Sequence, residues 1–238
     1  MNISKYMGNR MATSIRPAAP AENFTQAWAC DIINRASRIL GPTLPGCSVR
    51  RYECPPESTI KEWIFMCFRT SGPVLPFLDI QPLKYFNGVQ SCLCYKPMFL
   101  DSGLWDCFPG QRLPWDWKIE DGPEAVAERL RETLSTFDFT EMDRTATVEK
   151  LMEDPPPYPD QARDFKRGIC AIYLRRYREA AALFEDYLAQ FPGIDRSAYP
   201  RMLKAESYLE RLNSEPESVR SGMSTIMSKN WSLLQPLN

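Results

Sequence analysis

Histidine is absent from all 238 residues of the chain. This absence removes the side chain most often used for general acid–base catalysis, for zinc ligation and for activating a nucleophile. The sequence also lacks the glycine-rich phosphate-binding motifs and the GxSxG motif of serine hydrolases. We therefore expect a protein that is not an enzyme and that needs no metal ion or other cofactor.

Long apolar runs are missing as well. The six apolar residues from Trp63 to Phe68 fall far short of the roughly 20 that a membrane-spanning helix needs. Hydrophobic residues make up 44% of the chain and charged residues 25%, as in a globular protein with an apolar core. Residues 1–21 contain three basic residues, no acidic residue and no apolar core, so we expect a flexible leader, with a targeting segment as the alternative. The expected location is the cytoplasm.

The eight cysteines form no CxxC pair, so the spacing typical of zinc sites is missing. Cys92 and Cys94 are the only close pair, and this spacing places both side chains on one face of a strand. Without a secretory signal, the thiols are expected to be reduced and mostly buried as small apolar groups. The alternative is a metal- or cysteine-dependent enzyme in which a nearby lysine or arginine lowers the pKa of a thiol.

Residues 22–153 are predicted to form an α+β domain, a small antiparallel sheet packed with helices. Apolar residues on one face predict a helix from Asn23 to Leu40 and a second from Pro123 to Phe137, capped by Asp121. A shorter helix is predicted from Glu141 to Met152.

The sheet is predicted within residues 60–99, where aromatic and aliphatic residues alternate. Asn87–Gly88 lies between two such runs and predicts a hairpin with a two-residue turn, because both residues tolerate positive φ. Since proline cannot donate a ladder hydrogen bond, Pro76, Pro82 and Pro97 are expected at sheet edges or strand ends.

A second unit is predicted after residues 154–160, a stiff proline-rich linker. Residues 161–212 show the periodicity of a helical hairpin followed by a capping helix. Residues 213–238 are serine-rich and weakly patterned, which predicts a partly mobile tail.

Five residues of the helical segment follow the pattern of one tetratricopeptide unit: Gly168, Tyr177, Ala180, Phe184 and Pro192. The segment resembles that family over about 32 residues, although Ala171, Arg167 and Tyr187 replace family residues. The resemblance implies two antiparallel helices that touch at Ala180, with Phe184 in their core. A plain helical hairpin is the alternative.

The first half has the order helix, aromatic β-meander, tryptophan-bearing turn (Leu113–Trp117) and helix with an acidic start. In this order it resembles the small α+β domains that act as immunity proteins against bacterial polymorphic toxins. That resemblance implies a non-enzymatic protein that binds one secreted toxin and blocks its active site.

Charge is unevenly distributed along the chain. Between Asp116 and Asp164 there are fourteen acidic and six basic residues, a net charge of −8, although the whole chain carries −1. An acidic surface facing a basic toxin would speed association. The plain alternative is that Glu124, Glu128 and Glu132 form the solvated face of a helix.

The candidate binding residues combine this acidic stretch with three tryptophans in a segment rich in proline and glycine, where interface anchors are common. They are Trp105, Trp115, Trp117, Asp116, Asp121, Glu124 and Glu128. The predicted partner is a protein, the cognate toxin, and neither nucleic acid nor a membrane. The alternative function is a tetratricopeptide-like adaptor that binds an endogenous peptide or protein.

Overall fold

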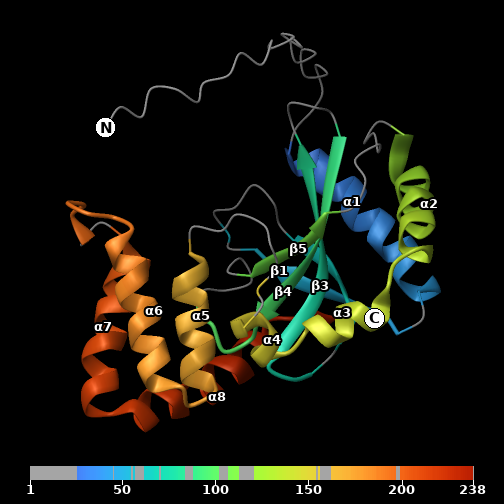
Figure 1. Cartoon of the computed structure of the whole chain (residues 1–238). Coiled ribbons are helices and arrows are strands. Elements are labelled where there is room, and N and C mark those ends of the chain that lie inside the picture. The colour runs from blue at the N-terminus through green and yellow to red at the C-terminus, as the bar shows by residue number, and fades with distance from the viewer. Residues whose placement is uncertain are drawn as a thin grey trace, which may run out of the picture.

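The structure, a computed structural model, describes residues 26–44, 46–54, 56, 62–69, 71–83, 88–101, 107–112, 121–153, 155, 162–196 and 199–237. It has the predicted α+β architecture: an antiparallel sheet packed with helices, followed by a group of helices (Figure 1). None of the helices in this part of the chain is both long enough and apolar enough to cross a bilayer.

The sheet has six strands in the order β5-β4-β3-β2-β1-β6, and all neighbouring strands are antiparallel. The strands are β1 (Ser48–Glu53), β2 (Glu62–Cys67), β3 (Val74–Leu83), β4 (Gly88–Pro97), β5 (Phe108–Arg112) and β6 (Gln235–Pro236). The last strand therefore joins the sheet beside the first.

The β3–β4 hairpin exists as predicted, but its predicted turn is wrong. Ten residue pairs run from Val74↔Pro97 to Leu83↔Gly88, so Gly88 belongs to β4, while residues 84–87 lie outside the described residues. A two-residue turn at Asn87–Gly88 would shift this register. The buried pairs along both faces of the hairpin, such as Phe77↔Cys94, outweigh the local turn preference.

The expectation that prolines lie at edges or strand ends holds for Pro97 and Pro82, the last residue of β4 and the next-to-last of β3, and fails for Pro76, which lies within the internal strand β3. Phe68 N donates to Pro76 O (3.1 Å), so by alternation the even-numbered residues of β3 direct their backbone groups toward β2. Among the residues that the structure describes, two residue pairs join β2 and β3. Pro76 and Pro82 therefore lie on the side of β3 where ladder bonds are few, and the β3–β4 ladder stays intact.

Helix α1 (Gln26–Leu40) supplies the hydrogen bonds that this short ladder lacks. The side-chain amide of Asn34 donates from Nδ2 to Glu62 O (3.0 Å) and accepts at Oδ1 from Ile64 N (3.1 Å). One buried side chain thus bonds to β2 as a neighbouring strand residue would.

Helix α2 (Gly122–Ser135) lies beside α1, as Figure 1 shows at the end of the sheet away from α5 to α7. The buried faces of the two helices meet the sheet residues Met66 and Leu78 in one cluster. Its other members are Ala29, Ile32, Ile33, Ala36, Leu40, Val126, Ala127, Leu130 and Leu134. The predicted apolar stripe of α1 therefore forms core from Ile32 to Leu40, whereas Trp28 on the same stripe is exposed, and the predicted stripe of α2 forms core from Val126 to Leu134.

The predicted helix from Glu141 to Met152 is divided into α3 (Phe139–Thr145) and α4 (Val148–Glu153). Asp138 caps α3 through Oδ1, which accepts from Thr140 N and Glu141 N at 2.9 and 3.0 Å. Thr147 Oγ1 accepts from Lys150 N (3.2 Å) at the start of α4. Two polar caps thus divide a stretch that periodicity alone predicts as continuous.

Helices α5 (Arg163–Tyr173) and α6 (Tyr177–Ala189) form the predicted hairpin. Ala180 and Phe184 are fully buried, and a Cβ atom on Gly168 would lie only 2.6 Å from Phe184 Cε1. The small residue in α5 is therefore what lets the two helices approach. Membership of the tetratricopeptide family stays a prediction.

The segment predicted as a tail from residue 213 contains all of α8 and all of β6. Helix α7 (Pro200–Ser214) is followed by α8 (Pro216–Ser232), whose Val219 and Met223 are buried. Val219, Met223 and Met227 are spaced by four residues, which is the periodicity of a helix. The high serine content of the segment made this pattern hard to see.

The linker at residues 154–160, apart from Pro155, lies outside the described residues, so the domain boundary stays a prediction. Contacts do cross it: Arg167 Nε donates to Met152 O (2.8 Å) and Arg176 pairs with Glu153 (2.9 Å). One buried cluster also contains residues of β3, β4 and β5 together with residues of α5 to α8.

Candidate functional site

The acidic candidates of α2 lie where the sequence predicts, at the start and on the exposed face of the helix. Asp121, Glu124 and Glu128 are exposed, and so is Glu132 one turn further on. The carboxylates therefore form a row on the face opposite Val126 and Leu130.

Two of these carboxylates are partly neutralised within the helix. Asp121 makes no capping bond with its side chain and instead pairs with Arg129 at 2.9 Å, so its predicted role as a helix cap is wrong. Glu128 pairs with Arg131. Glu124 and Glu132 have no ion-pair partner among the described residues, so their negative charges are not neutralised by a neighbouring side chain.

The other four candidate residues, Trp105, Trp115, Trp117 and Asp116, lie outside the described residues. Their proximity to α2 stays a prediction. The described residues of this proposed surface are therefore those of α2 alone.

The cysteines lie mainly in the core. Burial raises the pKa of Cys47 to about 11 and the pKa values of Cys30 and Cys170 to about 12, while burial also raises that of Cys67. Hydrogen bonds of the protonated Cys94 thiol with the sulfur atoms of Cys107 and Cys92 raise the pKa of Cys94 well above its ordinary value. These thiols stay protonated at neutral pH, which argues against a thiolate nucleophile at these positions.

Within the described ranges, no group of three or more cysteine and acidic side chains is arranged to hold a metal ion. Cys92 and Cys94 do share one face of β4, as their spacing predicts, and both join an apolar cluster with Leu75 and Phe77. There Cys92 Sγ lies 3.5 Å from Gly110 O.

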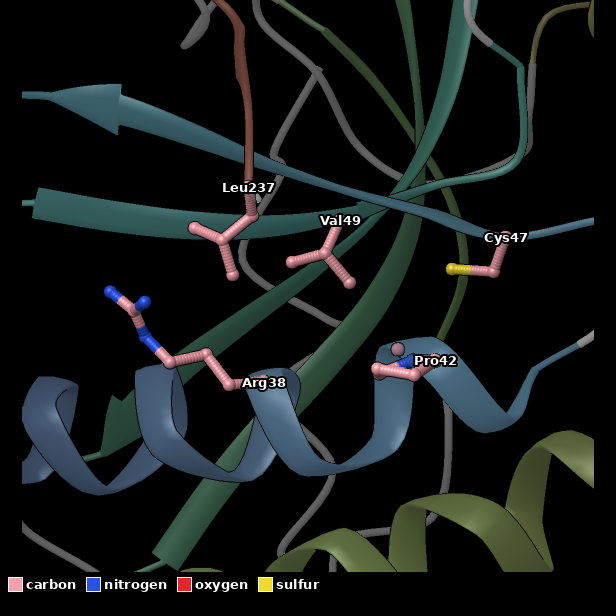
Figure 2. A pocket seen from close by; sticks show the side chains of 6 residues that line it. Arg38, Pro42, Cys47, Val49 and Leu237 are labelled. Carbon is pink, nitrogen blue, oxygen red and sulfur yellow. The ribbon is translucent and has the colours of Figure 1, made fainter.

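A cavity of about 380 Å³, which the sequence analysis did not predict, lies between the end of α1 and the β1 edge of the sheet. Figure 2 shows Arg38 and Pro42 on the helix side, and Cys47, Val49 and Leu237 on the sheet side. Its remaining lining residue, Gly41, belongs to the short 3-10 helix η1 (Gly41–Thr43).

Gly41 holds this corner close to the sheet. A Cβ atom at residue 41 would lie 1.8 Å from Val49 Cγ2, so any larger residue would push η1 away from β1. The cavity is thus lined by apolar groups, one protonated thiol and the guanidinium of Arg38, which pairs with Glu62 at 2.7 Å. Such a lining suits an apolar side chain better than a charged one.

Sequence reasoning missed this cavity because its walls come from both ends of the chain. Arg51 and Gln235, whose side chains are hydrogen-bonded beside it, are 184 residues apart. The available signal was the apolar group Trp231, Leu233 and Leu234 near the end of the chain.

The sequence matches no protein-family model, and no curated protein or solved structure was found to be significantly similar to it.

Proposed function

We propose that this protein is a non-catalytic cytoplasmic binding protein, an immunity or inhibitor protein that neutralises a cognate toxin by covering its active site. The observation that supports this proposal is the row of exposed carboxylates on α2. Because the opposite face of α2 is buried against α1, the row is held on a fixed helix rather than on a loop.

A rigid row of like charges acts mainly on the rate of encounter with a basic partner. The row belongs to a stretch, residues 116 to 164, that carries a net charge of −8. The competing explanation, a solvated helix face, is favoured by the pairs Asp121–Arg129 and Glu128–Arg131. The two explanations differ in whether the unpaired carboxylates of Glu124 and Glu132 speed association with a partner.

The experiment is co-expression with the secreted toxin encoded by a neighbouring gene, with bacterial growth as the readout. The chain should restore growth, and Glu124→Lys with Glu132→Lys should slow association by about tenfold at low salt while the fold is kept. The matched control is Glu185→Lys with Asp186→Lys, which reverses two exposed charges of α6. Equal association rates for both double variants would contradict the proposed surface.

A peptide-binding adaptor is the second candidate function. Beside the α5–α6 hairpin, Ile194, Tyr199 and Leu203 are exposed to 39, 52 and 46% around the connection between α6 and α7. Exposed apolar side chains of this size are typical of interaction sites. If this function holds, Tyr199→Ser with Leu203→Ser weakens partner binding, whereas the α2 double variant does not.

A further inference from the structure

Strand β6 covers the outer edge of β1 with few backbone contacts. The register pairs Arg51 with Gln235 and Arg50 with Pro236, and Leu237 N donates to Val49 O (3.2 Å). Pro236 has no N–H to donate, and both residues of β6 are exposed. Segment 235–237 is therefore a short, weakly attached occupant of a sheet edge.

Below this segment, the apolar side chain at position 237 meets unfilled space. Leu237 lines the cavity of about 380 Å³, and Figure 2 shows its side chain directed toward α1 with Val49 beside it. A larger apolar side chain at this position would bury more surface against Val49 and Pro42 without displacing the backbone.

Arg51, which lies on the same sheet face as Val49 and is paired with Gln235, has an incompletely satisfied guanidinium. Its Nη2 donates to Gln235 Oε1 (2.8 Å) and lies 3.5 Å from Glu53 Oε1. Its Nε is buried and finds no acceptor within the described part of the chain. The amide oxygen of Gln235 takes one bond, whereas a carboxylate there would offer two oxygens to Nε and Nη2 together.

We infer that the outer edge of β1 binds an extended segment of a partner protein that carries a carboxylate two residues before a large apolar side chain. The partner strand adds to β1 in place of segment 235–237, which occupies the edge when the partner is absent. The carboxylate binds the guanidinium of Arg51, and the apolar side chain fills the cavity. This site goes beyond the proposed function, since it uses β1 and η1 rather than α2.

Because the chain's own segment competes, the apparent affinity for the partner depends on how well that segment binds. A substitution that weakens the attachment of segment 235–237 should strengthen partner binding. A substitution that strengthens this attachment should weaken partner binding. This opposite response distinguishes the β1 edge from any site elsewhere on the surface.

The test uses the full chain and a fluorescein-labelled peptide, Leu-Leu-Glu-Pro-Phe-Asn, which is residues 233–238 with Glu and Phe at positions 235 and 237. Binding is measured by fluorescence anisotropy. The Leu237→Ser variant, checked for folding by circular dichroism, should bind about tenfold more tightly than the unaltered chain. The variant Gln235→Glu with Leu237→Phe should bind the peptide more weakly and melt at a higher temperature.

Specificity is tested with the same peptide carrying Gln in place of Glu. The unaltered chain should prefer the Glu peptide by about tenfold, and Arg51→Gln should abolish this preference. Arg50→Gln is the matched control, because by strand alternation Arg50 lies on the opposite sheet face, and it should keep the preference. A preference that survives Arg51→Gln, or equal peptide binding by all segment variants, would overturn the inference. So would dimerisation through exchanged segments, detected by light scattering.

Discussion

Three buried polar side chains join helices to backbone groups that are distant in sequence. Asn34 bonds to Glu62 O and Ile64 N, Asn230 Nδ2 donates to Met98 O and Leu100 O, and Lys166 Nζ donates to Cys107 O at 2.6 Å. Each buried carbonyl or N–H would cost free energy if left without a partner. At the scale of single residues, these side chains fix where helices attach to the sheet.

Replacement of Asn34 tests this role. Asn34→Ala leaves Glu62 O and Ile64 N without their partner, at about 1–3 kcal/mol for each group that stays dry. The free energy of unfolding, measured by urea denaturation, should fall accordingly. Arg35→Ala, on the exposed side of α1, is the control and should change it by less than about 0.5 kcal/mol. Equal stability of both variants would show that water replaces the amide.

The buried thiols predict a loss of stability in alkaline solution. Burial raises the pKa of Cys170 to about 12 from an ordinary value of 9.0, so the unfolded chain releases its proton first. This contribution is complete below pH 9 and is lost as the pH rises toward 12, with a slope of up to about 1.4 kcal/mol per pH unit. Urea denaturation between pH 8 and 11 should show a shallower decline for Cys170→Ala. Parallel curves would contradict this account.

At the scale of elements, the α5–α6 hairpin depends on the contact between Gly168 and Phe184. Gly168→Ala should overpack the contact at about 1–3 kcal/mol, which exceeds the gain of about 1 kcal/mol in helix propensity. With Phe184→Leu already present, the same substitution should be neutral or stabilising. Thermal denaturation of the four chains gives the coupling energy, and a value near zero would place the two residues out of contact.

The elements that the sequence predicts well are those with local signals. Periodic apolar residues locate α1, α2 and the α5–α6 hairpin, because such a face must be buried. The predicted turn of the hairpin is wrong, since the ten residue pairs, among them the buried pairs near Phe77 and Cys94, decide the register and a turn dipeptide does not.

The cavity and strand β6 could not be predicted for a different reason. A strand of two residues has no periodicity, and nothing near Gln235 in sequence indicates that it pairs with Arg51. Of the candidate binding residues, those on α2 were placed correctly on an exposed face because amphipathicity is a local property. The pairs Asp121–Arg129 and Glu128–Arg131 depend on side-chain conformations, which the spacing of the residues does not determine.

At the scale of the whole molecule, α8 joins the helical group to the sheet. Besides the bonds of Asn230, Trp231 Nε1 donates to Gly72 O (3.0 Å), and Leu234 is buried against the sheet cluster that contains Phe77. The two halves on either side of the predicted linker therefore share contacts at β3, β4 and β1.

These contacts predict that the two halves unfold together. Asn230→Leu removes the bonds to Met98 O and Leu100 O, at about 1–3 kcal/mol for each buried carbonyl. Helix content, followed by far-ultraviolet circular dichroism, and tryptophan fluorescence should then show one common midpoint, shifted to lower urea concentration. Ser221→Ala, on an exposed position of α8, is the control. Separate midpoints for the two probes would indicate independent domains.

The pairing of β1 with β6 has a consequence for synthesis on the ribosome. Residues 48–53 emerge early, but the segment that covers their outer edge emerges about 184 residues later. At about 5–20 residues per second, β1 keeps an open edge for roughly ten seconds or more. During that interval, the outer edge of β1 can pair with a strand of another polypeptide, and a chaperone that shields extended segments would protect it.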